Sequence, residues 1–128
     1  MRHRIYHHVV WTTRDRAPSI DEGAARYLEE VLPAVARQER ARVLALGIVS
    51  THVHLLIRVH PTTLIPRVIQ RMKGGTAVGA IRGSSEFPIR IRWAKGYNIQ
   101  SVSERALQVV GLYIQTQPQH HPEEAIVG

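Results

Sequence analysis

The stretch His52-Val-His-Leu-Leu-Ile-Arg-Val59 decides how this chain folds and is the best guide to what it does. Its run of apolar and β-branched residues predicts a β-strand. Because side chains two positions apart project from the same face of a strand, His52 and His54 share one face and Val53 points to the other. Two imidazoles on one face can bind a metal ion or can be ordinary surface histidines. Taken alone, the pattern is a weak indication of a metal site.

The segments around this strand predict the rest of a sheet. Residues 42–49 form another apolar run, and only Ser50 and Thr51 separate it from 52–59, which indicates a tight hairpin. Residues 4–13, rich in β-branched and aromatic types, predict the first strand. The last strand is expected over 88–93, where isoleucine alternates with arginine, and over 97–102 after an interruption at Lys95-Gly96.

Two helices are expected between these strands. Ser19 and Glu22 have the spacing of a capping box and predict the start of the first helix. Pro33 lies inside that helix, so a kink or a break is expected there. Thr62 or Thr63 is expected to cap the second helix.

A third helix is expected after the last strand, capped by Ser103 and ending near Gln117, because Pro118 disfavours continuation. The resulting order is β-α-β-β-α-β-α. Its first six elements match the split βαβ, ferredoxin-like arrangement, an antiparallel sheet with helices on one face. The predicted fold class is therefore α+β, with an added C-terminal helix and a single domain over residues 1–128.

Composition narrows the class of partner. The chain has 17 Lys and Arg against 10 Asp and Glu, a formal net charge of +7, and its only lysines are Lys73 and Lys95. Arginine has a planar fork suited to phosphate oxygens, so nucleic acid is the favoured partner. The absence of cysteine excludes disulfides and thiolate metal sites. We expect a cytoplasmic protein without a membrane segment, because no apolar run has the required length and the N-terminus lacks a signal-peptide pattern.

A second candidate group lies on the last predicted helix. Tyr113 and Gln117 are four residues apart, which places a phenol and a carboxamide on one helix face. A phenol can attack phosphorus, and a carboxamide oxygen can help to hold a metal ion. The alternative is that Tyr113 is an amphipathic packing residue at the edge of the core.

The order and spacing of several motifs resemble those of the single-tyrosine HUH transposases of simple insertion sequences and of the REP-associated tyrosine transposases. The motifs are Tyr6-His-His-Val-Val-Trp-Thr-Thr13, His52-Val-His-Leu-Leu-Ile57, Arg71-Met-Lys-Gly74, Trp93-Ala-Lys-Gly-Tyr97 and Tyr113-Ile-Gln-Thr-Gln-Pro-Gln-His-His121. The resemblance implies metal binding by His52, His54 and Gln117, with Mg²⁺ or Mn²⁺ as the ion. It implies that Tyr113 is the nucleophile, which cleaves and rejoins single-stranded DNA through a 5′-phosphotyrosine link. It also implies a homodimer that recognises hairpin-forming DNA ends.

Two departures from the family pattern bear on the site. Thr51 stands where relatives commonly carry aspartate or another polar residue, which leaves the support of His52 from that position open. The chain also ends soon after the tyrosine helix. His120 and His121 offer alternative ligands there, but a solvated tail is the expectation.

Basic residues in the second half of the chain are the candidates for DNA contact. We expect them on the second helix and around the last strand: Arg67, Arg71, Lys73, Arg90, Arg92 and Lys95. Trp93 and Tyr97 could stack on exposed bases, although core packing is the simpler role for Trp93. Two other functions remain open: a catalytically silent ferredoxin-like nucleic-acid-binding protein, and a metal hydrolase in which the histidines activate water and Tyr113 is structural.

Overall fold

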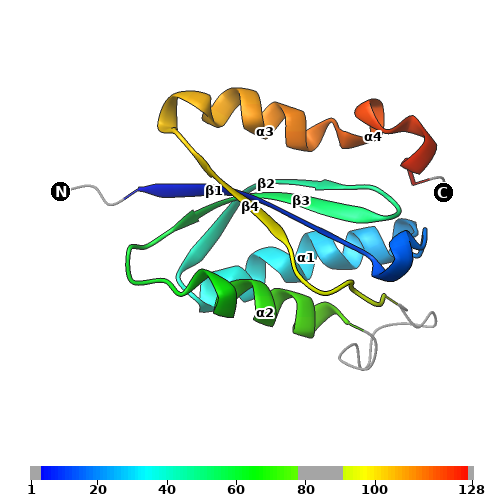
Figure 1. The fold of residues 1–128 in the computed structure, drawn as a ribbon, viewed down its shortest axis with the longest axis horizontal. Helices are drawn as coiled ribbons and strands as arrows, with labels where there is room; N and C mark the ends of the chain where they lie inside the picture. The colour runs from blue at the N-terminus through cyan, green and yellow to red at the C-terminus, as the bar shows by residue number, and fades with distance from the viewer. Residues whose placement is uncertain (1–3, 78–90, 127–128) are drawn as a thin grey trace.

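A computed structural model describes residues 4–77 and 91–126, and these form an α+β fold around one four-stranded antiparallel sheet (Figure 1). The spatial order of the strands is β2-β3-β1-β4. This is the order of the split βαβ arrangement, so the predicted fold class is confirmed. The strands are β1 (Ile5–Thr12), β2 (Ala41–Ile48), β3 (His52–Val59) and β4 (Asn98–Val102).

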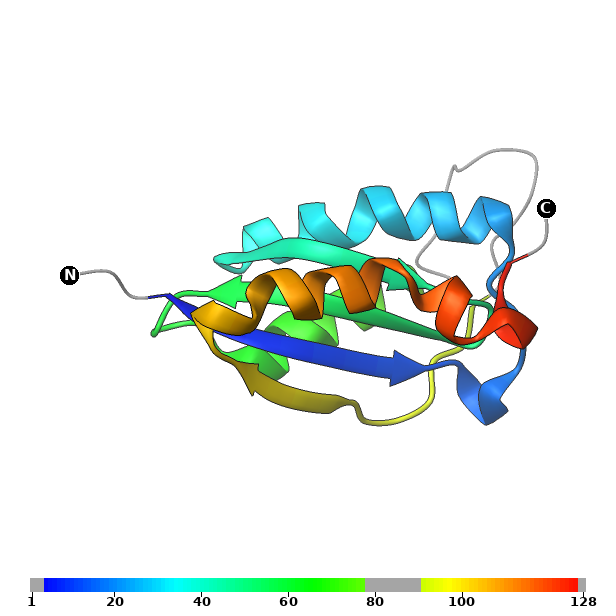
Figure 2. The same ribbon diagram turned by 90° about the horizontal axis from the view of Figure 1, so that it is seen from above.

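Helices cover both faces of the sheet. Figure 1 shows α1 (Glu22–Gln38) and α2 (Ile65–Thr76) on one face, and α3 (Leu107–Gln115) on the other. Figure 2, seen from above, shows α3 running along the sheet toward the end where the C-terminal turns lie. The shorter helical turns are η1 (Arg14–Arg16), η2 (Glu104–Ala106), α4 (Gln117–His120) and η3 (Pro122–Glu124). In the described part of the chain, no helix has both the length and the apolar character needed to cross a bilayer.

The strand β3 is buried on both faces, which explains its continuous apolar run. On one face Val53, Leu55 and Ile57 pack with α1 and α2 in a core that has sixteen buried members among the described residues. On the other face Leu56 belongs to a much smaller cluster beneath α3, whose buried members are Ala45, Leu56 and Ile114. The candidate site residues lie on the side of the sheet that carries this smaller cluster.

Gly47 allows α3 to approach the sheet closely. It lies on β2 directly opposite His54. A Cβ atom built on Gly47 would lie 1.8 Å from the carbonyl oxygen of Ile114 and 3.0 Å from Cγ of Gln117. Only glycine leaves room for the helix backbone at this point. The end of α3 and the first residue of α4 therefore sit directly on the strand surface next to the histidines.

The first two helices begin at residues other than those predicted. Asp21, not Ser19, is the N-cap of α1, and its carboxylate accepts a hydrogen bond from the backbone N–H of Ala24 at 2.8 Å. α1 also continues unbroken past Pro33 to Gln38, so the expected break is absent. Its neighbours Leu32 and Ala36 are fully buried, and this packing outweighs the one backbone hydrogen bond that proline removes.

Helix α2 starts at Ile65 with Leu64 as its N-cap, rather than with either threonine. The hydroxyl of Thr63 is used instead to accept from the backbone N–H of His60 and to donate to the carbonyl of Arg40. Pro66 stands in the first turn of α2, where a proline is well tolerated.

The last helix is divided. α3 ends at Gln115, and Pro118 stands in the first turn of the separate helix α4, where a proline needs no N–H partner. Pro118 is thus incompatible with a continuation of α3 but suits the first turn of α4. The third helix itself begins after a 3-10 turn that follows Ser103, which makes no side-chain cap.

The predicted strand over 88–93 is wrong for its described part, and residues 88–90 lie outside the described residues. Residues 91–93 form no strand, and only Trp93 makes an isolated bridge, to Thr13. The edge position beside β1 is taken by β4, which pairs with residues Tyr6 to Val10. Gly96, at φ +83, turns the chain between the two segments.

Candidate active site

His52 and His54 lie on the face of β3 that α3 covers, and both are buried. His52 is 5% exposed and His54 is 7% exposed, and the centroids of their rings are 4.9 Å apart. They are therefore not ordinary surface histidines. Burial of two imidazoles next to each other requires polar partners on both rings.

The structure brings Tyr113 and Gln117 to the same place. The Tyr113 ring centroid lies 6.1 Å from that of His54, edge to face, and the residue is 41% exposed. Gln117 is fully buried. Although the helix is interrupted between them, the Gln117 amide still donates to the Tyr113 carbonyl at 3.2 Å. Residues from mid-chain and from the C-terminal segment thus meet within one chain.

Hydrogen bonds at the Nδ1 atoms fix the orientation of both histidine rings. His52 Nδ1 lies 3.2 Å from Glu124 Oε2 and 3.0 Å from the hydroxyl of Thr51, which itself donates to Glu124. His54 Nδ1 lies 2.9 Å from Nε2 of His8. Because Nδ1 of each ring has these partners, Nε2 is the nitrogen of each ring that could bind an ion, and the Gln117 side chain also interacts with His52. Partners at the second ring nitrogen are typical of metal-binding histidines, because they fix the tautomer.

Burial favours the neutral form of these rings. Burial, together with the smaller effect of the neighbouring histidines, lowers the pKa of His54 to about 3. Burial also lowers the pKa of His52, although the Glu124 carboxylate and the Gln117 amide act in the opposite direction. The pKa of His8 is lowered by burial as well. Neutral imidazole is the form that binds a metal ion, so the rings need not lose protons to do so.

The Gln117 side chain supplies a test of whether a metal ion fits here. Its Oε1 atom is buried and has no hydrogen-bond partner by distance and angle among the described residues. An unsatisfied buried carbonyl oxygen is costly, and a cation beside it would satisfy it. Two imidazole nitrogens and one amide oxygen are also a donor set that suits a divalent transition metal such as Mn²⁺ better than Mg²⁺. The residues present therefore fit a bound divalent ion.

Sequence reasoning missed His8 and Glu124. His8 lies on β1, whose register with β3 places Val10 opposite His54, so His8 is one step along the same face. The pairing of the strands, which the sequence does not state, is needed to find it. No sequence motif marks Glu124, which lies after the last helix that the sequence predicted. The question about Thr51 is answered, because its hydroxyl supports both His52 and Glu124.

The C-terminal segment is folded onto the site, so the expectation of a solvated tail is wrong. The backbone carbonyl of Glu124 accepts from the N–H of Ser50 at 2.8 Å, and its carboxylate pairs with Arg16 at 3.3 Å. The ring of His121 lies 5.5 Å from that of His52, and the ring of His120 lies 4.7 Å from that of Tyr113.

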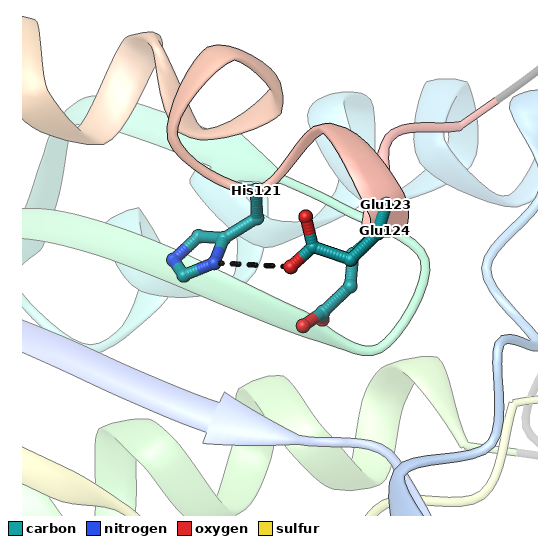
Figure 3. A group of neighbouring side chains, drawn as sticks. All are labelled: His121, Glu123 and Glu124. Atoms are coloured by element: carbon teal, nitrogen blue, oxygen red, sulfur yellow. Dashed lines mark ion pairs between the residues drawn. The ribbon is translucent and has the colours of Figure 1, made fainter.

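A second group of possible ligands lies beside the first. Figure 3 shows His121, Glu123 and Glu124, whose ligand atoms lie within 4.8 Å of one another, with His121 Nδ1 3.8 Å from Glu123 Oε1. The carboxylate of Glu124 is already engaged by Thr51, and Glu123 is exposed. The buried pair of histidines with the unsatisfied amide is the stronger candidate.

The predicted DNA-contact residues on α2 lie on the opposite side of the sheet from the histidines. Arg67 and Arg71 both form ion pairs with Glu39, at 3.1 and 2.8 Å. Lys73 donates to the backbone carbonyls of Ala94 and Gly96. These three side chains have structural partners, and their role in binding DNA stays a prediction.

The remaining candidates lie near the start of β4. Arg92 and Lys95 are exposed, whereas Arg90 lies outside the described residues. Trp93 is half-buried, donates from Nε1 to Thr76 and packs edge-on against a core tryptophan. Packing therefore accounts for Trp93. Tyr97 is exposed and remains available for stacking.

The fold and the site together define an α+β protein with ferredoxin-like topology and a buried histidine cluster facing a tyrosine. A family model described as "Transposase IS200 like" matches residues 1–117. The chain belongs to this family of transposases.

Individual relatives agree with this assignment. The chain is 24% identical over 119 residues to the ISDra2 transposase TnpA of Deinococcus radiodurans, an alignment that covers 90% of this chain and 85% of that protein. A solved structure from Deinococcus radiodurans R1, described as a candidate transposase, has a TM-score of 0.69 at 21% identity and covers 99% of this chain and 95% of its own. A REP-associated tyrosine transposase bound to a REP hairpin has a TM-score of 0.68 at 12% identity, over 94% of this chain and 70% of its own.

Proposed function

We propose that this transposase cleaves and rejoins single-stranded DNA by metal-dependent transesterification, with Tyr113 as the nucleophile. The observation that carries the proposal is the convergence of the Tyr113 ring on His54, beside the buried, unsatisfied Oε1 atom of Gln117. A phenol that can attack phosphorus and side chains that can hold a metal ion thus lie close together within one chain, which supports the proposal. His52, His54 and Gln117 would hold the ion.

The protein residues have separate tasks in this reaction. The Tyr113 hydroxyl oxygen forms a bond to phosphorus, the bond from phosphorus to the 3′ oxygen breaks, and the products are a 5′-phosphotyrosine and a free 3′-hydroxyl. Tyr113 must give up its proton to attack, and its exposure leaves a path for that proton to water. A bound divalent ion would polarise the phosphate oxygens and lower the barrier. Attack by a 3′-hydroxyl on the phosphotyrosine reverses the step and rejoins a strand.

Glu124, Thr51 and His8 act as positioning residues. They contact the Nδ1 atoms of the two ligand rings rather than the DNA. These contacts favour the tautomer that carries its proton on Nδ1, so the lone pair on Nε2 of the same ring can bind a metal ion. Neighbouring groups tune metal-binding histidines in this way.

The proposed DNA partner is a single strand that folds into a hairpin, and the proposed assembly is a homodimer. The solved tyrosine transposase with a REP hairpin supports a hairpin as the ligand class. The excess of arginine in this chain supports an interaction with phosphate groups.

Covalent capture of DNA tests the proposal. Labelled single-stranded DNA from the flanks of the gene is incubated with the protein and Mn²⁺, and the products are separated under denaturing conditions. We expect a protein–DNA adduct that is lost in Tyr113→Phe and kept in the control Tyr97→Phe, which removes the hydroxyl of a similarly exposed tyrosine but keeps the ring that could stack on a base. Binding without an adduct would favour a silent binding protein. Cleavage that survives Tyr113→Phe would favour a metal hydrolase.

A further inference from the structure

Five arginines gather at the end of the sheet that is far from the histidines. They line a hollow of about 600 Å³ together with His60 and come from four separate elements or their flanks. This arginine hollow consists of Arg4, Arg37, Arg40, Arg42 and Arg58. None of the described residues that line it is acidic. Figure 1 shows that β1 begins toward the end marked N, whereas α4 lies at the other end of the molecule.

Two of these arginines face each other directly. Arg42 of β2 is the register partner of Arg58 of β3. Like charges at directly opposed positions of an antiparallel pair destabilise the sheet. Arg58 also lies on the same face as His54, four residues along β3, which corresponds to about 13 Å. The chain thus maintains an unfavourable pair of charges on the face that carries the candidate active site.

Arg40 adds a second unfavourable feature. It follows α1 with φ at 58°, in the left-handed region that glycine and asparagine adopt most easily. The position would be more stable with glycine, but arginine supplies a further guanidinium to the hollow. Arg40 and the facing pair Arg42 and Arg58 thus each lower the stability of the fold while they add positive charge to the hollow.

The charges of the hollow are largely uncompensated. Among the described residues, Arg4 is its only member with an ion pair, to Glu104 at 3.4 Å. Glu39, which follows α1 and precedes Arg40 in the chain, is already engaged by Arg67 and Arg71. An anion in the hollow would relieve the repulsion that the fold itself leaves in place.

We propose that the arginine hollow binds the phosphodiester backbone of a DNA duplex, such as the stem of a hairpin, while the single strand reaches the histidine pocket. An open hollow with guanidiniums from several elements suits a repeating phosphate chain better than one small anion. A duplex carries one charge per roughly 1.7 Å of its axis and meets five arginines better than a single strand does. The place of the stem relative to cleavage rests on the proposed function, but the binding itself does not require cleavage.

The salt dependence of binding tests this proposal. The probe is a labelled hairpin oligonucleotide with a duplex stem of arbitrary sequence and a single-stranded tail, and the protein carries Tyr113→Phe so that no cleavage occurs. Each lost phosphate contact reduces the slope of log K against log salt by about 0.9 on a duplex. We expect a reduction of about 0.9 for Arg58→Gln and about 1.8 for Arg42→Gln combined with Arg58→Gln.

The matched control is Arg26→Gln, which removes the same charge from an exposed position on α1 outside the hollow. We expect its slope to equal that of the parent protein. Removal of the facing charges should also raise the melting temperature of the Arg42, Arg58 double variant. If that variant does not fold, Arg37→Gln with Arg40→Gln tests the same surface from α1.

Equal slopes in the hollow variants and the control would overturn the proposal. An equal loss on a single-stranded probe of the same composition would also overturn it, because the hollow would then track single strands. A protein with intact Tyr113 that forms no DNA adduct would refute the proposed function and leave these binding measurements unaffected.

Discussion

Replacement of Gly47 by alanine should disable the site without removing any of its proposed ligands. The added Cβ would lie 1.8 Å from the Ile114 carbonyl oxygen and 2.8 Å from its carbonyl carbon. Both are backbone atoms, so a side-chain rotation cannot relieve the clash. The end of α3 must therefore move away from β2.

The size of that movement follows from the same distances. The contact at 1.8 Å must open by about 1.2 Å to reach even 3.0 Å, below which real Cβ contacts are essentially absent. Overpacking of this kind costs about 1–3 kcal/mol of unfolding free energy. A misplacement of about 1 Å can reduce a catalysed rate roughly 100-fold. We expect both losses, because Tyr113 and Gln117 flank Ile114 on the displaced segment.

The assay compares Gly47→Ala with Gly111→Ala. A Cβ at Gly111 would lie 3.8 Å from the nearest atom, an ordinary contact, and alanine is the better helix former by about 1 kcal/mol. Thermal unfolding, calorimetric Mn²⁺ binding and covalent DNA capture are measured for both. Gly47→Ala should lose stability, metal affinity and adduct formation, and Gly111→Ala should keep all three. Wild-type adduct formation and Mn²⁺ affinity in Gly47→Ala would refute the argument.

Three further predictions follow from the polar contacts. Glu124→Ala removes the carboxylate that holds His52 and should weaken Mn²⁺ binding by about 10- to 100-fold in calorimetry, whereas unchanged affinity would contradict a positioning role. The depressed pKa of His54, about 3, means that the unfolded chain takes up a proton below about pH 6.5 while the folded chain does not; stability should be full above that pH and fall by up to about 1.4 kcal/mol per pH unit toward pH 3. Denaturant titrations at several pH values check this, and His54→Asn should flatten the dependence. Thr76→Val leaves the Trp93 N–H without its buried acceptor and should cost about 1–3 kcal/mol in the same titrations, so an unaltered unfolding free energy would show that this hydrogen bond contributes little.

Most of the sheet could be predicted because its strands have recognisable local sequence patterns. The apolar run from His52 to Val59 and the short link after residue 49 correctly predicted the central hairpin. The predicted strand over 88–93 failed in its described part because alternation between Ile91 and Arg92 is compatible with any extended segment. The competition for the edge of β1 is a tertiary property, and β4 occupies that edge.

The site could be predicted only as far as its motifs extend. His52, His54, Tyr113 and Gln117 are recognisable from spacing, and the structure brings them together. The supporting groups could not be found in that way, because Glu124 reaches its partners from more than 70 positions away in the chain. Their contribution depends on the path of the C-terminal segment, which no local pattern determines.

Because the two apolar clusters differ in size, the thermal stability of the protein and the integrity of its candidate active site can change independently. Within residues 4–77 and 91–126, the cluster between the sheet and α1 and α2 has sixteen buried members, whereas the one beneath α3 has three. Regions with few buried apolar contacts open at a lower free energy than the rest of a domain. A substitution such as Ile114→Ala can therefore loosen the tyrosine-bearing layer while the bulk of the protein still melts cooperatively at high temperature. Screens that rank variants by heat resistance alone would overlook this kind of inactive protein.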